Sequence, residues 1–87
     1  MDGRALLAWN LRRLRAERGV SQERLAADTG VDRAYVSELE RGLGNASVDL
    51  LDRLATSLGT PLAEFFKMPE AGAEVPKSLP AGRRPRT

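Results

Sequence analysis

The 87-residue chain contains no cysteine and no histidine. Without cysteine it forms no disulfide and offers no thiolate to a metal ion. Without histidine it lacks the commonest metal ligand and the commonest general base. Its carboxylates are scattered along the chain, and no group of them suggests a reaction site. We therefore expect no enzyme activity, no metal site and no bound cofactor.

Long apolar stretches are also missing. No segment approaches the length needed to cross a membrane, and no signal-peptide pattern opens the chain. We therefore expect a cytoplasmic protein that makes no membrane contact.

An excess of positive charge is absent from most of the chain. Residues 1–66 contain nine Arg and ten Asp or Glu, a net charge of −1. Residues 67–87 contain five Lys or Arg and two Glu, a net charge of +3. Because the high isoelectric point comes from the C-terminal part, bulk charge gives weak evidence for nucleic-acid binding, and local arrangement has to decide.

Residues 21–42 contain the clearest local pattern, two short helices joined by a tight turn. Ser21 is a good N-cap for the first helix, which is expected to end at Gly30, where a residue without Cβ accepts a left-handed conformation. Asp32 then caps a second helix, which is expected to run through Arg41 and stop at the glycine that follows.

The spacing of small and apolar residues in this stretch predicts how the two helices pack. Ala26 is small enough for a second helix to cross close by, and Gly30 follows four residues later. Val36 and Leu39 are three residues apart and share one face. These offsets favour a helix-turn-helix, whose second helix enters the major groove of DNA. The alternative is an ordinary helical hairpin in an all-α bundle.

The flanking sequence predicts three more helices, giving an all-α, five-helix domain over residues 1–68. The first covers residues 4–18, with a buried stripe of leucines. The fourth covers residues 48–58, begins at Ser47, and is expected to turn Val48, Leu51, Leu54, Ala55 and Leu58 inward. A short fifth helix is expected to use Thr60 as its cap, to carry Pro61 in its first turn, and to end at Pro69.

Residues 69–87 differ in composition from the rest. They contain four of the five prolines and show no apolar periodicity, so they read as a disordered basic tail. Residues 82–86 form a small basic cluster. Either this is a solvated tail or it is an arm that binds phosphates without sequence preference.

The helix order, with the motif in helices two and three, resembles the Cro/C1-type (XRE) family of phage repressors and bacterial regulators, which has a lambda-repressor-like fold. Residues 31–42, followed by Asn45 and Ser47, look especially like the controller proteins of restriction–modification systems. The resemblance covers residues 4–66. Two positions differ: Gly44 stands where a basic residue is frequent, and Ala46 stands where Pro is frequent. The first difference leaves one phosphate or base contact of that loop unassigned.

Four side chains of the second motif helix are candidates for contacting bases. Arg33 suits bidentate pairing with guanine O6 and N7, and Ala34 suits a thymine methyl group. Ser37 can donate or accept. Glu38 can accept from cytosine N4, although its charge repels phosphate.

Other residues are expected to contact the DNA backbone or the groove edge. The resemblance implies that Gln22 binds phosphate, and its place at a helix N-terminus favours an anion. Arg41 and Asn45 suit phosphate contacts that set register. Tyr35 is expected either to reach a phosphate or the groove edge, or to pack inside the domain.

Glu40 is expected to face inward. The resemblance implies that it pairs with Arg15 of the first helix, and a partly buried charge requires such a partner. We interpret this ion pair as structural.

Leu50, Phe65 and Phe66 are apolar side chains in excess of what one small core needs. Since family members pair through this region, the resemblance implies a two-fold interface here. Alternatively, Leu50 and Phe66 only broaden the monomer core. If the dimer interface lies elsewhere, Trp9 is the next candidate for it.

Together these features predict a sequence-specific transcriptional regulator that binds a near-palindromic double-stranded DNA operator as a homodimer. RNA polymerase is a candidate further partner. Two alternatives are the antitoxin of a toxin–antitoxin pair, and a protein-interaction module that uses the same fold.

Overall fold

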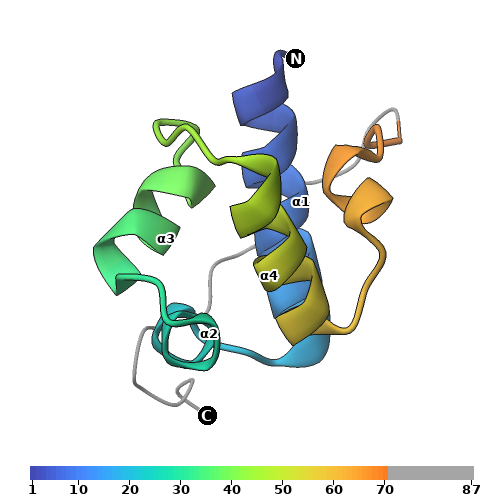
Figure 1. The fold of residues 1–87 in the computed structure, drawn as a ribbon. Coiled ribbons are helices and arrows are strands. Elements are labelled where there is room, and N and C mark those ends of the chain that lie inside the picture. The colour runs from blue at the N-terminus through green and yellow to red at the C-terminus, as the bar shows by residue number, and fades with distance from the viewer. Residues whose placement is uncertain (71–87) are drawn as a thin grey trace, which may run out of the picture.

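A computed structural model describes residues 1–70 of the chain, and they form an all-helical domain. Four α-helices are followed by one 3₁₀ helix, and no strand occurs in this part of the chain: α1 (Gly3–Arg18), α2 (Gln22–Thr29), α3 (Arg33–Glu40), α4 (Val48–Leu58) and η1 (Leu62–Phe66). Helix α1 contacts α3, α4 and η1, while α2 packs against α3 and α4. In Figure 1, α4 crosses in front of α1, with α3 on one side and η1 on the other.

The expected caps determine where most helices begin. Ser21 accepts a hydrogen bond from the backbone N–H of Arg24 (3.0 Å), and Ser47 accepts one from Leu50 (3.1 Å). Helix α4 has the predicted bounds. Helix α3 ends at Glu40, one residue earlier than predicted, because Arg41 leaves the helical conformation at φ −97° and ψ 4°.

The fifth element is a 3₁₀ helix, so the prediction of a fifth α-helix is wrong. Thr60 does not cap it: the residue before its first turn is Pro61, and no side chain supplies a capping bond. The backbone N–H of Glu64 donates to the carbonyl oxygen of Pro61 (3.0 Å), three residues earlier. Pro61 and Lys67, which flank the element, have extended backbones, and the five residues between them form a short 3₁₀ helix.

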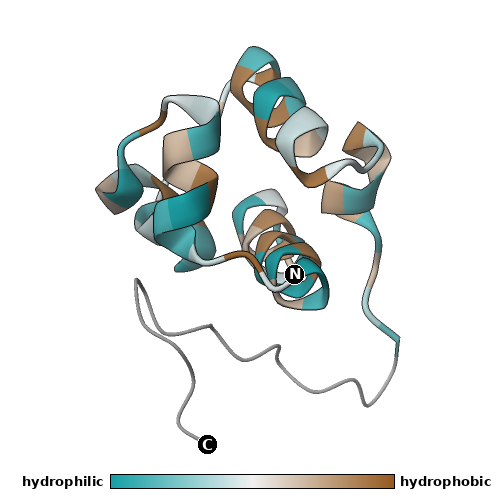
Figure 2. Ribbon diagram, turned by 90° about the horizontal axis from the view of Figure 1, so that it is seen from below, coloured by the Kyte–Doolittle hydropathy of each residue, from teal (hydrophilic) through white to brown (hydrophobic). Residues whose placement is uncertain are grey.

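The core is built from the inward sides of all five elements. Figure 2 shows hydrophobic segments alternating with hydrophilic ones around the helices. The prediction for Val48 is wrong: it is the first residue of α4, and its side chain is 64% exposed. The core side chains are Leu7, Leu11, Leu14, Leu25, Ala26, Val36, Leu39, Leu51, Leu54, Ala55, Leu58 and Phe65.

A buried asparagine joins η1 to α1. Asn10 is completely buried, and its Nδ2 donates to the carbonyl oxygens of Phe65 and Lys67, each at 2.9 Å. Arg13 donates to Asn10 Oδ1 (3.1 Å) and forms an ion pair with Glu64 of η1 (3.0 Å). The two bonds from Asn10 satisfy carbonyl groups at the end of η1.

No helix within residues 1–70 is both long and apolar enough to span a membrane. The disorder expected from residue 71 onward lies outside the described residues. Residues 69 and 70 have no regular secondary structure.

Candidate nucleic-acid interface

Helices α2 and α3 pack against each other and are joined by a tight turn. Ala26 is buried on α2, and its carbonyl oxygen accepts from the N–H of Val31 in the turn (3.1 Å). Gly30 has φ 73°, a left-handed backbone conformation that residues with a Cβ atom rarely adopt. Asp32 then caps α3 by accepting from Ala34 N–H (3.1 Å). The turn therefore sets the angle at which α3 leaves α2.

Helix α3 has one buried side and one exposed side. Val36, Leu39 and Glu40 are at most 2% exposed. The predicted base-contacting side chains lie elsewhere on the helix: Arg33, Ala34 and Glu38 are exposed, and Ser37 is half-buried. Arg41, next to the end of the helix, is also exposed. A short helix anchored on one side thus presents polar and charged groups to the outside.

The structure brings Arg15 and Glu40 together as a buried ion pair. Their side chains are 0% and 2% exposed. Arg15 Nε donates to Glu40 Oε2 (2.5 Å), and Arg15 Nη2 donates to Glu40 Oε1 (2.7 Å), so the pairing is bidentate. Arg15 Nη1 also donates to the carbonyl oxygen of Val20 (2.9 Å). One guanidinium therefore connects α1, the turn before α2 and the end of α3.

Gln22 belongs to the same network. Its Nε2 donates to Glu40 Oε1 at 3.0 Å. As the first residue of α2, it lies at a helix N-terminus, and its side chain is half-buried. The family resemblance implied that Gln22 binds the DNA backbone but gave no sign of its bond to Glu40, eighteen residues later.

The loop between α3 and α4 is held by two residues of other elements. The Tyr35 hydroxyl donates to the carbonyl oxygen of Asn45 (2.7 Å), and Arg4 Nε donates to that of Gly44 (3.1 Å). Tyr35 is half-buried and packs against the core, so its hydroxyl positions the loop, while the Asn45 residue stays exposed. The sequence pattern gave Arg4 no such role.

Gly44 is buried against the core. A Cβ atom at this position would lie 2.5 Å from Cδ2 of Leu39, and Leu39 is itself only 1% exposed. A side chain at position 44 would therefore require the buried Leu39 side chain to shift, because the loop lies close against the core here.

The three residues predicted to form a dimer interface occupy different environments. Phe65 is completely buried in the core of a single chain, so including it in that surface was wrong. Phe66 is 44% exposed, and Leu50 is half-buried against the core. Met68, two residues after Phe66, is 64% exposed. Trp9 is half-buried and lines a groove between α1 and the end of α3.

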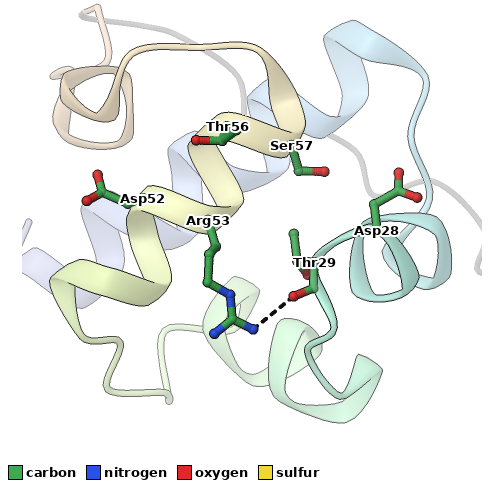
Figure 3. A pocket seen from close by; sticks show the side chains of 6 residues that line it. All are labelled: Asp28, Thr29, Asp52, Arg53, Thr56 and Ser57. Atoms are coloured by element: carbon green, nitrogen blue, oxygen red, sulfur yellow. Dashed lines mark hydrogen bonds between the residues drawn. The ribbon is translucent and has the colours of Figure 1, made fainter.

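A second hollow lies between the C-terminal end of α2 and the outer side of α4 (Figure 3). Polar and charged residues line it, with Asp28 and Thr29 on one side and residues of α4 on the other. Arg53 spans it and donates to the carbonyl oxygen of Thr29 (2.8 Å). Because this bond satisfies a carbonyl group at the end of α2, Arg53 has a structural role here.

Comparison with known proteins agrees with this geometry. A family model described as Helix-turn-helix (HTH_3) matches residues 11–65. An uncharacterized HTH-type transcriptional regulator, y4dJ of Sinorhizobium fredii, is 44% identical over 65 residues, which are 75% of this chain and 84% of that protein. A hypothetical transcription factor of Neisseria meningitidis is 39% identical over 69 residues, which are 79% of this chain but only 65% of that protein.

A solved structure is similar over nearly its full length. The restriction-modification controller protein C.AhdI from Aeromonas hydrophila superimposes with a TM-score of 0.70 at 41% identity, covering 72% of this chain and 96% of that one.

Proposed function

The chain belongs to the Cro/C1-type helix-turn-helix family (HTH_3), and from this premise we propose that it is a sequence-specific transcriptional regulator. It binds double-stranded DNA as a homodimer on a near-palindromic operator. It acts by its position at a promoter, where it excludes or contacts RNA polymerase. The named regulators and controller proteins among its relatives support this proposal.

One observation carries the proposal: α3 is anchored by its buried side and leaves its polar side free. In the proposed complex α3 lies in the major groove, where Arg33 pairs with guanine and Ala34 meets a thymine methyl group. Ser37 and Glu38 are further base contacts. Because Glu38 repels phosphate, it discriminates between bases more than it adds affinity.

Backbone contacts frame the reading helix. Gln22 binds a phosphate at the N-terminus of α2, where the helix dipole and free N–H groups favour an anion. Arg41 and Asn45 bind phosphates beyond the other end of α3. Tyr35 contributes indirectly, because its hydroxyl holds the backbone of Asn45 (2.7 Å).

Dimerisation is needed because one helix-turn-helix buries too little surface for tight, specific binding. The proposed interface is the surface of Phe66, Met68 and the exposed part of Leu50, of which the first two are 44% and 64% exposed. A two-fold axis there would place two copies of α3 in successive major grooves, about 34 Å apart.

Phe66→Glu tests this interface. We expect a folded monomer at concentrations where the parent is a dimer, with weak binding to a palindromic site, because the charge opposes burial. Leu50→Glu should act likewise, although its side chain also contacts the core. Sedimentation measures the oligomeric state, and circular dichroism checks that the variants are folded.

Leu43→Glu is the matched control, because Leu43 is 63% exposed on the loop between α3 and α4. This variant should remain dimeric. If the folded Phe66→Glu variant also sediments as a dimer, the interface lies elsewhere, with Trp9 as the next candidate.

Selection of binding sites from a random DNA pool tests the proposed function directly, and Arg33→Ala tests the assignment of α3. This substitution should weaken operator binding by about 1–3 kcal/mol and relax the base preference at one position of each half-site. Binding is compared at matched salt. A mutant that binds its site as tightly as the parent shows that Arg33 contacts no base, and a pool that yields no preferred sequence contradicts sequence-specific binding.

A further inference from the structure

We infer that Glu40 is a positioning residue for DNA binding: its carboxylate holds the Gln22 amide in the orientation that binds phosphate. This inference rests on the proposed function. It assigns to a buried ion pair a task beyond holding the fold together.

The geometry fixes Glu40 before it reaches Gln22. Arg15 binds both of its oxygens, at 2.5 and 2.7 Å, and is itself tied to the carbonyl of Val20 (2.9 Å). Both charged side chains are almost wholly buried, so neither has freedom to move. Glu40 Oε1, which already accepts from Arg15, also accepts from Gln22 Nε2 at 3.0 Å.

This second bond has a direct consequence for the amide. An amide nitrogen carries two hydrogens, and the bond to Glu40 uses one, which leaves the other available to a phosphate oxygen. The bond also sets which end of the amide is nitrogen and limits its rotation. A side chain ordered before DNA arrives loses less conformational entropy on binding, and such preorganisation raises affinity.

The network also fixes the distance between two parts of the interface. Gln22 begins α2, and Glu40 ends α3. Their bond therefore sets the phosphate-binding amide relative to the helix that reads bases.

The double variant Arg15→Met/Glu40→Met separates the two roles of Glu40, which are stabilising the fold and orienting the Gln22 amide. Replacing a buried ion pair with apolar side chains of similar volume is often neutral or stabilising, so the fold should survive, as thermal melting would show. The carboxylate that orients Gln22 is nevertheless lost. We expect operator and non-operator DNA to bind about tenfold more weakly, since a phosphate contact carries no sequence information.

Gln22→Ala completes a thermodynamic cycle. Alone, it should weaken DNA binding by about the same factor of ten; combined with the double variant, it should cause almost no further loss. Asn45→Ala is the matched control, because its proposed phosphate contact lies outside the network, and its effect should be additive in both backgrounds. A folded double variant that binds as tightly as the parent, or full additivity with Gln22→Ala, overturns the inference.

The parent protein provides a measurement that needs neither a variant nor DNA. In NMR relaxation measurements, the Gln22 side-chain amide should show restricted motion on the picosecond-to-nanosecond timescale. A freely reorienting amide would overturn the inference even if the double variant does not fold. Failure of the parent to bind any DNA would instead reject the proposed function, so the two failures are distinguishable.

Discussion

The α2–α3 pair and η1 show two ways of stabilising a short helix. Helices α2 and α3 have eight residues each, and each begins at its own side-chain cap. The five-residue η1 has no cap, and its final carbonyls are bound by Asn10, more than fifty residues earlier in the chain. The first kind of helix is specified by neighbouring residues, whereas the second depends on a distant part of the fold.

Glu40→Ala tests whether the local caps are enough to stabilise α2 and α3, or whether the domain also depends on the ion pair with Arg15. The substitution leaves the fully buried Arg15 without its carboxylate. We expect the free energy of unfolding to fall by about 3–5 kcal/mol. Chemical denaturation measures this loss. An unchanged melting temperature together with weakened DNA binding would mean that Glu40 acts on recognition alone.

Asn10→Ala tests the other side of the comparison. It removes the donor to the carbonyls of Phe65 and Lys67, so unfolding free energy should fall by about 1–3 kcal/mol. The dimer should weaken as well, because Phe66 lies between these two residues. Asn45→Ala is the matched control: its exposed side chain should change stability by less than about 0.5 kcal/mol. Equal effects of the two substitutions would show that η1 does not depend on Asn10.

Deletion of residues 72–87 should have the smallest effect on stability of the three changes, because we expect this segment to support neither the α2–α3 pair nor η1. The segment has no apolar periodicity, so we expect the melting temperature and the choice of operator to stay the same. DNA binding should weaken slightly through the loss of four positive charges, Lys77, Arg83, Arg84 and Arg86. That difference should shrink as salt rises. A large drop in melting temperature would instead mean that the deleted residues pack on the domain.

The sequence predicted those features whose causes lie within a few residues. The caps Ser21, Asp32 and Ser47 placed three helices, and periodicity placed Val36 and Leu39 in the core. The 3₁₀ form of η1 and the buried Asn10 were not predictable in this way, because their partners are more than fifty residues apart. Neighbouring phenylalanines gave no local sign that Phe65 faces the core while Phe66 stays outside.

In the candidate nucleic-acid interface, too, only some features could be predicted from local sequence. The exposed side of α3 follows from helical spacing, whereas the resemblance to a known family supplied the Arg15–Glu40 pairing. Neither source indicated that Gln22 donates to Glu40, because that bond joins the beginning of one helix to the end of the next. Local spacing identifies which residues are exposed, but not which of them share a hydrogen bond.

The close contact between Gly44 and Leu39 constrains how this domain could be redesigned or could diverge. Introducing lysine or arginine at position 44 is an obvious way to strengthen nonspecific affinity for DNA, yet the new Cβ would lie 2.5 Å from Leu39 Cδ2. The gain in charge would therefore come with a packing defect beneath the recognition helix. We expect a smaller residue at position 39 to relieve this contact, so the two positions form a linked pair that single-site libraries would miss.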